Sequence, residues 1–158
     1  MNQAPHPTPE NIMKTGTAVW ASKVLLTAVR FQLFTLLAQK GTMSGSEIKS
    51  QLSLQCSKRH VYDFLDALTS MGFLKRDGIL DSENYSNSPD TAFFLDQAKP
   101  SYIGGMVEMV NDRLYRFWGH LEEGLLTGLP QNEAKEGGNL FKEIYASQDK
   151  LRAFVHAI

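Results

Sequence analysis

Residues 44–85 of the chain read SGSEIKSQLSLQCSKRHVYDFLDALTSMGFLKRDGILDSENY, and this stretch carries the clearest structural signals. Ser44 and Glu47 have the spacing of a capping box, which predicts the start of a short helix. A break over residues 53–57 separates it from a second helix, which stops near Gly72 and repeats apolar residues at helical spacing. These apolar residues are Val61, Phe64, Leu65, Leu68 and Met71.

The end of this stretch predicts a β-hairpin. Asp77-Gly78 is a turn signal between short apolar runs at residues 73–74 and 79–80, and Tyr85 is placed on the returning strand. Helix, turn, helix and hairpin follow one another in the order of a winged helix. The sequence therefore predicts a mainly α-helical fold, with a winged helix-turn-helix and a small hairpin wing.

Upstream, the sequence predicts a flexible leader over residues 1–8 and then two helices. Pro9 and Glu10 suit the first turn of a helix. Its apolar residues cover more than one stripe, so we interpret it either as a central core helix or as a subunit interface. Residues 31–37 form a second short helix that stops near Gly41. The apolar residues of the first helix are Ile12, Val19, Trp20, Val24, Leu25, Leu26 and Val29.

Downstream, residues 89–95 predict a helical turn, and residues 100–127 predict one long helix with Gly128 as its stop. That helix would be about 40 Å long, and its broad apolar band suits a dimerisation surface. The pair Gly104-Gly105 predicts close packing against another backbone. A polar loop and two short helices, around residues 140–145 and 147–155, complete the chain. We expect a winged-helix dimerisation domain over residues 9–99 and a helical extension over residues 100–158.

The composition is that of an ordinary soluble globular protein, with 42% hydrophobic and 21% charged residues. The formal net charge of -1 gives no global attraction to nucleic acid or to an anionic membrane. No apolar run reaches the length of a membrane span. The first dozen residues do not have the pattern of a signal peptide. Cys56 is the only cysteine, which suits a reducing compartment. The expected location is the cytoplasm.

A winged helix can bind DNA, so a transcriptional regulator is the alternative function. The second helix of the motif begins with Lys58, Arg59 and His60, but Asp63 and Asp66 follow on its polar side. Phosphate contacts normally require several unopposed Lys or Arg side chains. The pattern therefore favours an ordinary solvated helix face.

The sequence predicts neither a catalytic site nor a metal or cofactor site in this chain. Cys56 and His60 lie four residues apart, but no third ligand stands nearby. We interpret His120 as a polar contact of the long helix. No glycine-rich turn follows a predicted strand, so the unit that would hold a nucleotide or S-adenosylmethionine is not indicated.

Several short stretches, in order and covering nearly the whole chain, resemble one protein family. They are WASKVL (20–25), FTLLA (34–38), YDFLDAL (62–68), GFL (72–74), YSNSP (85–89), FWGHL (117–121) with Gly128, and FKEIY (141–145). The family is that of the acetylserotonin (hydroxyindole) and plant-phenolic type O-methyltransferases, which depend on S-adenosylmethionine. Each stretch alone is weakly specific, and together they are quite specific.

The resemblance implies that this chain is a dimerisation and substrate-lid module of a small-molecule O-methyltransferase. In the family, two N-terminal winged-helix domains pair through intertwined helices and do not bind DNA. A C-terminal Rossmann-like domain holds S-adenosylmethionine and a histidine base, and both would lie beyond residue 158. The parent enzyme would form a homodimer and methylate a hydroxyl of an aromatic or polyketide-like acceptor. This chain alone would have no turnover.

By position, the resemblance implies five residues that line the acceptor pocket. They are Trp20 on the first helix and Met109, Arg113, Phe117 and Trp118 on the long helix. Met and aromatic side chains form an adaptable apolar wall for a flat acceptor, although ordinary core or dimer packing also accounts for these residues. A stand-alone interaction protein that forms mixed dimers with a full-length enzyme is a further alternative. The sequence also leaves open whether the chain is a fragment, a natural truncation or half of a split enzyme.

Overall fold

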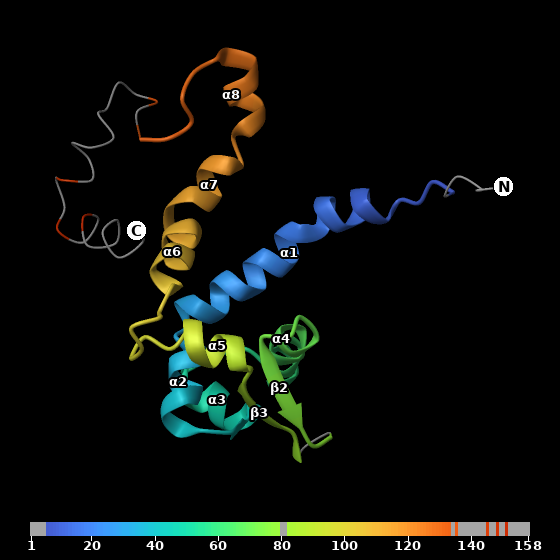
Figure 1. Cartoon of the computed structure of the whole chain (residues 1–158), viewed down its shortest axis with the longest axis vertical. Coiled ribbons are helices and arrows are strands. Elements are labelled where there is room, and N and C mark those ends of the chain that lie inside the picture. Colours follow the sequence, from blue (N-terminus) through green and yellow to red (C-terminus); the bar gives the residue numbers. More distant parts are fainter. Residues whose placement is uncertain are drawn as a thin grey trace.

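Two helical segments project from a bundle of shorter elements in the computed structural model, which describes residues 6–79, 82–133, 135, 145, 148 and 151. One segment is α1 (Glu10–Arg30), and the other runs through α6 (Gly104–Met109), η2 (Val110–Leu114), α7 (Tyr115–Trp118) and α8 (Leu121–Thr127) (Figure 1). The bundle contains α2 (Leu33–Lys40), β1 (Met43–Ser44), α3 (Gly45–Gln51), α4 (Lys58–Ser70), β2 (Leu74–Asp77), β3 (Asn84–Asn87) and α5 (Pro89–Phe94). The prediction of a mainly helical fold is confirmed.

The sheet has three antiparallel strands in the order β1-β3-β2. The predicted hairpin is present, with Leu74 opposite Asn87 and Asp77 opposite Asn84. Its turn differs from the prediction. Gly78 has a positive φ of 87°, but Ile79, the first residue of the second apolar run, lies outside the strands and is 73% exposed. Strand β1, which the sequence did not reveal, pairs with β3.

The core lies where the C-terminal half of α1 meets α2, α3, α4 and the sheet. Leu33 and Leu65 are fully buried, and Phe34 is 1% exposed. Tyr85 is also buried, and its hydroxyl donates to Asp66 Oδ1 at 2.9 Å. The same carboxylate accepts from Arg76 Nη1 at 2.9 Å, so one acidic side chain ties α4 to both strands of the hairpin. Burial, followed by the contact with Asp66, raises the pKa of Tyr85, which keeps its hydroxyl a donor.

The predicted capping box is present at the start of α3. Ser44 Oγ accepts from the Glu47 backbone N–H at 3.3 Å, and the Ser44 backbone N–H donates to Glu47 Oε2 at 2.8 Å. Replacing Ser44 with Ala leaves the amide at N3 without its cap, so we expect the free energy of unfolding to fall by about 1 kcal/mol. Urea denaturation measures this change. Ser50→Ala, an exposed position on the same helix, is the matched control, and an equal loss in both variants would contradict a capping role.

The long helix predicted over residues 100–127 is wrong in two respects. It begins at Gly104, because the backbone before it turns back onto α5, where the Ile103 N–H donates to the Phe94 carbonyl at 2.9 Å. Its α-helical hydrogen-bond pattern is also interrupted. Residues 110–114 form a π-helical turn, in which the Tyr115 N–H donates to the Val110 carbonyl. The helix then breaks at Gly119 and His120, where His120 leaves the helical region with φ −104° and ψ 18°.

The two adjacent glycines at the start of α6 are both buried. At Gly104 the close contact is with a side chain and not with another backbone. A Cβ on Gly104 would lie 2.1 Å from the hydroxyl oxygen of Tyr102. The phenol ring of Tyr102 therefore occupies the space that a larger residue at this position would need.

Two further expectations concern the ends of the chain and the membrane. The described residues leave out the first five residues of the predicted leader. They also leave out most of the two helices predicted around residues 140–145 and 147–155. Among the described helices, none alone has the length and hydropathy of a membrane span, although α1 and α2 meet that test when taken together across a 53° bend.

Candidate functional site

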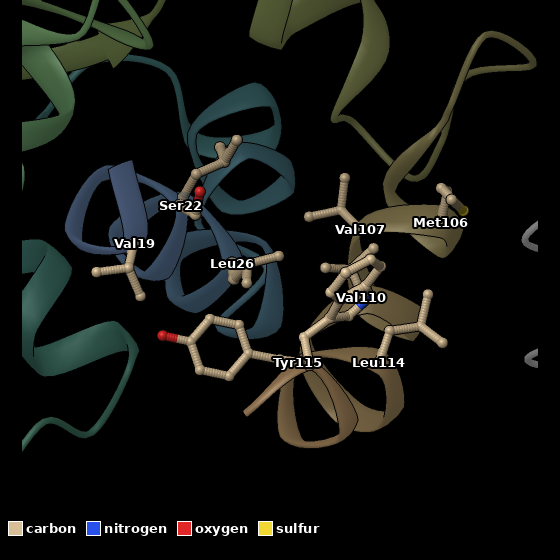
Figure 2. Close-up of a pocket in the computed structure, with 10 residues that line it drawn as sticks. Val19, Ser22, Leu26, Met106, Val107, Val110, Leu114 and Tyr115 are labelled. Carbon is tan, nitrogen blue, oxygen red and sulfur yellow. The ribbon is translucent and has the colours of Figure 1, made fainter. Parts of the chain in front are cut away.

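An open apolar groove separates α1 from the helical segment that begins with α6. Val19, Ser22 and Leu26 face it from α1, and Val107, Val110 and Leu114 face it from α6 and η2 (Figure 2). Figure 2 also shows the Tyr115 ring pointing toward α1. The remaining lining residues are Leu25, Met106 and Trp118. The groove has a volume of about 400 Å³, which lies within the range of small-molecule sites. Its walls can make apolar contacts with a ligand of matching shape.

Polar contacts bridge the two walls of this groove. Lys23 Nζ donates to Asn111 Oδ1 at 2.7 Å and lies 4.9 Å from the centre of the Tyr115 ring. Arg30 forms an ion pair with Asp112. The π-helical turn carries both Asn111 and Asp112. Because these bridges are exposed, each is worth only about 0–1 kcal/mol, so they align the helices more than they stabilise them.

A second, smaller cavity of about 150 Å³ lies between α7 and the segment after α8. Its lining residues are Arg116, Phe117, His120, Gln131, Asn132 and Lys135. The segment is held to η2 by Arg113, whose Nε and Nη2 donate to Glu133 Oε1 and Oε2 at 2.7 and 3.1 Å. The hydrogen bond from Arg113, with smaller contributions from the charges of Arg113 and Arg116, lowers the pKa of Glu133.

The Arg113–Glu133 pair gives a prediction for residues 128–133. Replacing Arg113 with Gln removes both guanidinium hydrogen bonds to Glu133, in a pair whose side chains are only 24% and 17% exposed. We expect the free energy of local opening of this segment to fall by about 1–3 kcal/mol. Amide hydrogen exchange of residues 128–133 measures the loss. Arg30→Gln breaks the exposed pair with Asp112 and serves as the control, with an expected cost below about 1 kcal/mol.

The same pair predicts a pH dependence. The folded-state pKa of Glu133 is lowered from 4.5, so its contribution is fully present above about pH 4.5 and is lost as the pH falls through the lowered value. Amide protection of residues 128–133 should therefore decrease on acidification in the wild type. The same acid dependence in Arg113→Gln would contradict this assignment.

The structure distributes the five residues that the sequence proposed for an acceptor pocket. Trp118 lines the groove and Phe117 lines the smaller cavity. Trp20 is 71% exposed, next to the groove residue Val19. Arg113 is engaged by Glu133, and Met109 is half-buried at the end of α6 without lining either cavity. Each of these two cavities is lined by only one of the five among the described residues, and their role in acceptor binding stays a prediction.

Sequence reasoning missed most of the groove, although a signal was present. Val19, Ser22 and Leu26 have the i, i+3, i+7 spacing that places residues on one helix face. Val107, Val110 and Leu114 repeat the same spacing on the other wall. Both helices carry apolar residues on other faces as well, so the spacing alone did not show which faces meet.

The polar face of α4, the helix weighed for DNA binding, carries paired charges. Arg59 Nε lies 3.8 Å from Asp63 Oδ2, and Asp66 is shared by Arg76 and Tyr85. Cys56, close to the start of α4, is exposed. Within the described part of the chain, no group of three or more His, Cys, Asp or Glu side chains could hold a metal ion.

Comparisons with known proteins agree on one family. The family model of the O-methyltransferase dimerisation domain matches residues 13–97. The tetracenomycin polyketide synthesis 8-O-methyl transferase TcmO of Streptomyces glaucescens is 35% identical over 150 residues, which are 95% of this chain and 42% of that protein. The N,N-dimethyltransferase OxyT of Streptomyces rimosus is 33% identical over 134 residues, which are 85% of this chain and 36% of that protein.

Solved structures show the same fold. The human N-acetylserotonin methyltransferase, determined in complex with S-adenosylmethionine, superposes with a TM-score of 0.85 at 23% identity. The match covers 99% of this chain and 46% of the human chain. The chain thus spans less than half the length of each of these relatives.

Proposed function

The chain belongs to the O-methyltransferase dimerisation-domain family, and on this premise we propose that it is the dimerisation and substrate-lid module of a small-molecule O-methyltransferase. The parent enzyme uses S-adenosylmethionine, forms a homodimer and works in the cytoplasm. Residues 9–99 form the winged-helix dimerisation domain, and residues 100–158 form the helical extension toward the donor-binding domain.

The observation that carries the proposal is the apolar surface left exposed on the projecting helices. On α1, Ile12 is 75% and Trp20 is 71% exposed. On α8, Leu125 is 78% and Leu126 is 79% exposed. Soluble monomers rarely leave large contiguous apolar patches open to water. A second copy of the chain against α1, and a further domain against α8, would cover these surfaces.

The arrangement of α3, α4 and the β2–β3 hairpin supports a winged helix as the base of the module. Its order matches that motif, and Asp66 holds the hairpin against α4. The paired charges on α4 favour a structural role over phosphate binding, which needs unopposed bases. We therefore favour the methyltransferase module over the transcriptional regulator.

The lid function rests on the groove and on the residues beside it. Trp118 contributes to an apolar wall, and Trp20, Met109, Arg113 and Phe117 remain our candidates for further acceptor contacts. An aromatic or polyketide-like hydroxyl compound suits such a wall. The name of the Streptomyces glaucescens relative, which refers to polyketide synthesis, supports this substrate class.

Two measurements test the proposal. Light scattering of the purified chain should give twice the mass of the 17.7 kDa protomer at micromolar concentration and on dilution. A stable monomer would contradict the dimerisation role. With labelled S-adenosylmethionine and a panel of phenolic acceptors, the chain alone should transfer no methyl group, and detectable turnover would contradict the role of a module without chemistry of its own.

The lid role is tested separately in a chimera. Here the chain replaces the matched 42% of the Streptomyces glaucescens enzyme, and methyl transfer to that enzyme's acceptor should be retained. Trp118→Ala in the chimera should raise KM for the acceptor about tenfold, since one aromatic wall is worth roughly 1–2 kcal/mol. The control is Phe93→Ala, an exposed aromatic on α5, and equal effects of both substitutions would contradict the lid role.

A further inference from the structure

The smaller cavity differs from the apolar groove in its charge. Three of its lining side chains, Arg116, His120 and Lys135, are basic, and among the described residues that line it none is acidic. The side-chain amides of Gln131 and Asn132 complete the lining. The cavity has a volume of about 150 Å³, and two of its polar side chains contact each other, since Lys135 Nζ donates to Gln131 Oε1 at 3.0 Å.

Two of the three bases lie against the same carboxylate: Glu123 Oε1 accepts from Lys135 Nζ at 2.6 Å, and Glu123 Oε2 lies 3.7 Å from His120 Nδ1. The bidentate contact with Arg113 occupies Glu133. In the part of the chain that the structure describes, no carboxylate lies within ion-pair distance of Arg116. The guanidinium of Arg116 therefore forms no ion pair among the described residues, although its charge contributes to the lowered pKa of Glu133.

Arg116 is also held in place by an aromatic ring. Its guanidinium carbon lies 4.7 Å from the centre of the Phe117 ring, a cation–π contact that orients the planar group. A guanidinium oriented in this way presents N–H donors at the spacing of the two oxygens of a carboxylate. Phe117 adds an apolar wall beside the donors, and a cavity of roughly 150 Å³ accommodates one benzene ring.

We propose that this cavity binds an aromatic carboxylate of single-ring size. The carboxylate pairs with Arg116, Lys135 and His120 flank it, and the ring packs beside Phe117. The inference goes beyond the proposed function and does not depend on it, because binding is measured on the chain itself without any methyl transfer.

The test is a titration of the isotope-labelled 158-residue chain, followed by amide chemical shifts. The probe is 3-hydroxybenzoate, and its neutral counterpart 3-hydroxybenzamide and acetate are the comparison ligands. We expect 3-hydroxybenzoate to bind at least tenfold more tightly than either one, with shift changes at residues 116–120 and 131–132. A charge-assisted bidentate contact is commonly worth about tenfold or more in affinity.

Matched variants identify the residue responsible. Arg116→Gln should weaken 3-hydroxybenzoate binding at least tenfold. Arg116→Lys keeps the positive charge but cannot form two parallel hydrogen bonds to a carboxylate, so it should give an intermediate affinity. Arg59→Gln, a highly exposed arginine on α4, should bind as the wild type does. Three results would each overturn the proposal: equal binding of the benzamide, equal binding of acetate, or unchanged binding by Arg116→Gln.

Discussion

Replacing Trp20 with Glu is expected to raise the dissociation constant of the dimer about 100- to 1,000-fold. Trp20 lies on the projecting part of α1 with 71% of its surface exposed, and a Trp that becomes buried in an interface commonly contributes about 2 kcal/mol or more. In a twofold-symmetric dimer each substitution is present twice, so two unfavourable carboxylates are introduced. Analytical ultracentrifugation over a dilution series measures the constant.

The control for this prediction is Gln55→Glu, which adds the same charge at an exposed position between α3 and α4. We expect that variant to dimerise as the wild type does. Circular dichroism should show equal helix content in both variants, so that lost association is not confused with unfolding. A Trp20→Glu protein that remains a tight dimer would place the interface on another surface.

Replacing Phe34 with Ala is expected to lower the free energy of unfolding by about 3–5 kcal/mol. The ring is 1% exposed at the centre of the core, and the substitution leaves a cavity that the surrounding helices can fill only in part. Domains of this size are stable by about 5–15 kcal/mol, so the loss is a large share of the total. Urea denaturation at a fixed protomer concentration measures it, because dimerisation adds concentration-dependent stability.

Phe93 provides the matched control for this substitution. It lies on α5 and is 53% exposed, so Phe93→Ala removes the same atoms from a site that water already reaches. We expect a loss below about 1.5 kcal/mol, which is the most that its edge-to-face contact with Phe94 commonly contributes. The centres of the two rings lie 4.8 Å apart. Similar losses at both positions would contradict the assignment of the core.

The sequence predicted the bundle well because its signals are local. The capping box at Ser44 and the positive φ angles at Gly41, Gly72 and Gly128 follow from single-residue chemistry. Strand β1 was missed because two residues cannot show an alternating pattern, and Ser44 serves both as a strand residue and as the cap of α3. The connection between the two strands of the hairpin is longer than a two-residue Asp77-Gly78 turn, because β2 ends at Asp77 and β3 begins only at Asn84.

The candidate site was harder to predict because it depends on helix register. The predicted site residues on the long helix assumed one regular periodicity from residue 100 to residue 127. The π-helical turn shifts that periodicity after Val110, and the break at His120 ends it. Within α7, Trp118 faces the groove and its neighbour Phe117 faces the smaller cavity, because consecutive helical residues point about 100° apart.

The π-helical turn between α6 and α7 also has a consequence for the divergence of such proteins. A π turn contains one residue more than the α-helical turn it replaces, and one residue corresponds to about 100° of rotation about a helix axis. Because the wider turn already absorbs that rotation, loss of a single codon at Asn111 or Asp112 would restore a regular helix and leave the side chains of α7 facing the same cavities. A lineage could therefore lose the π turn, and with it one of the two residues that bridge to α1, without exchanging the walls of either cavity.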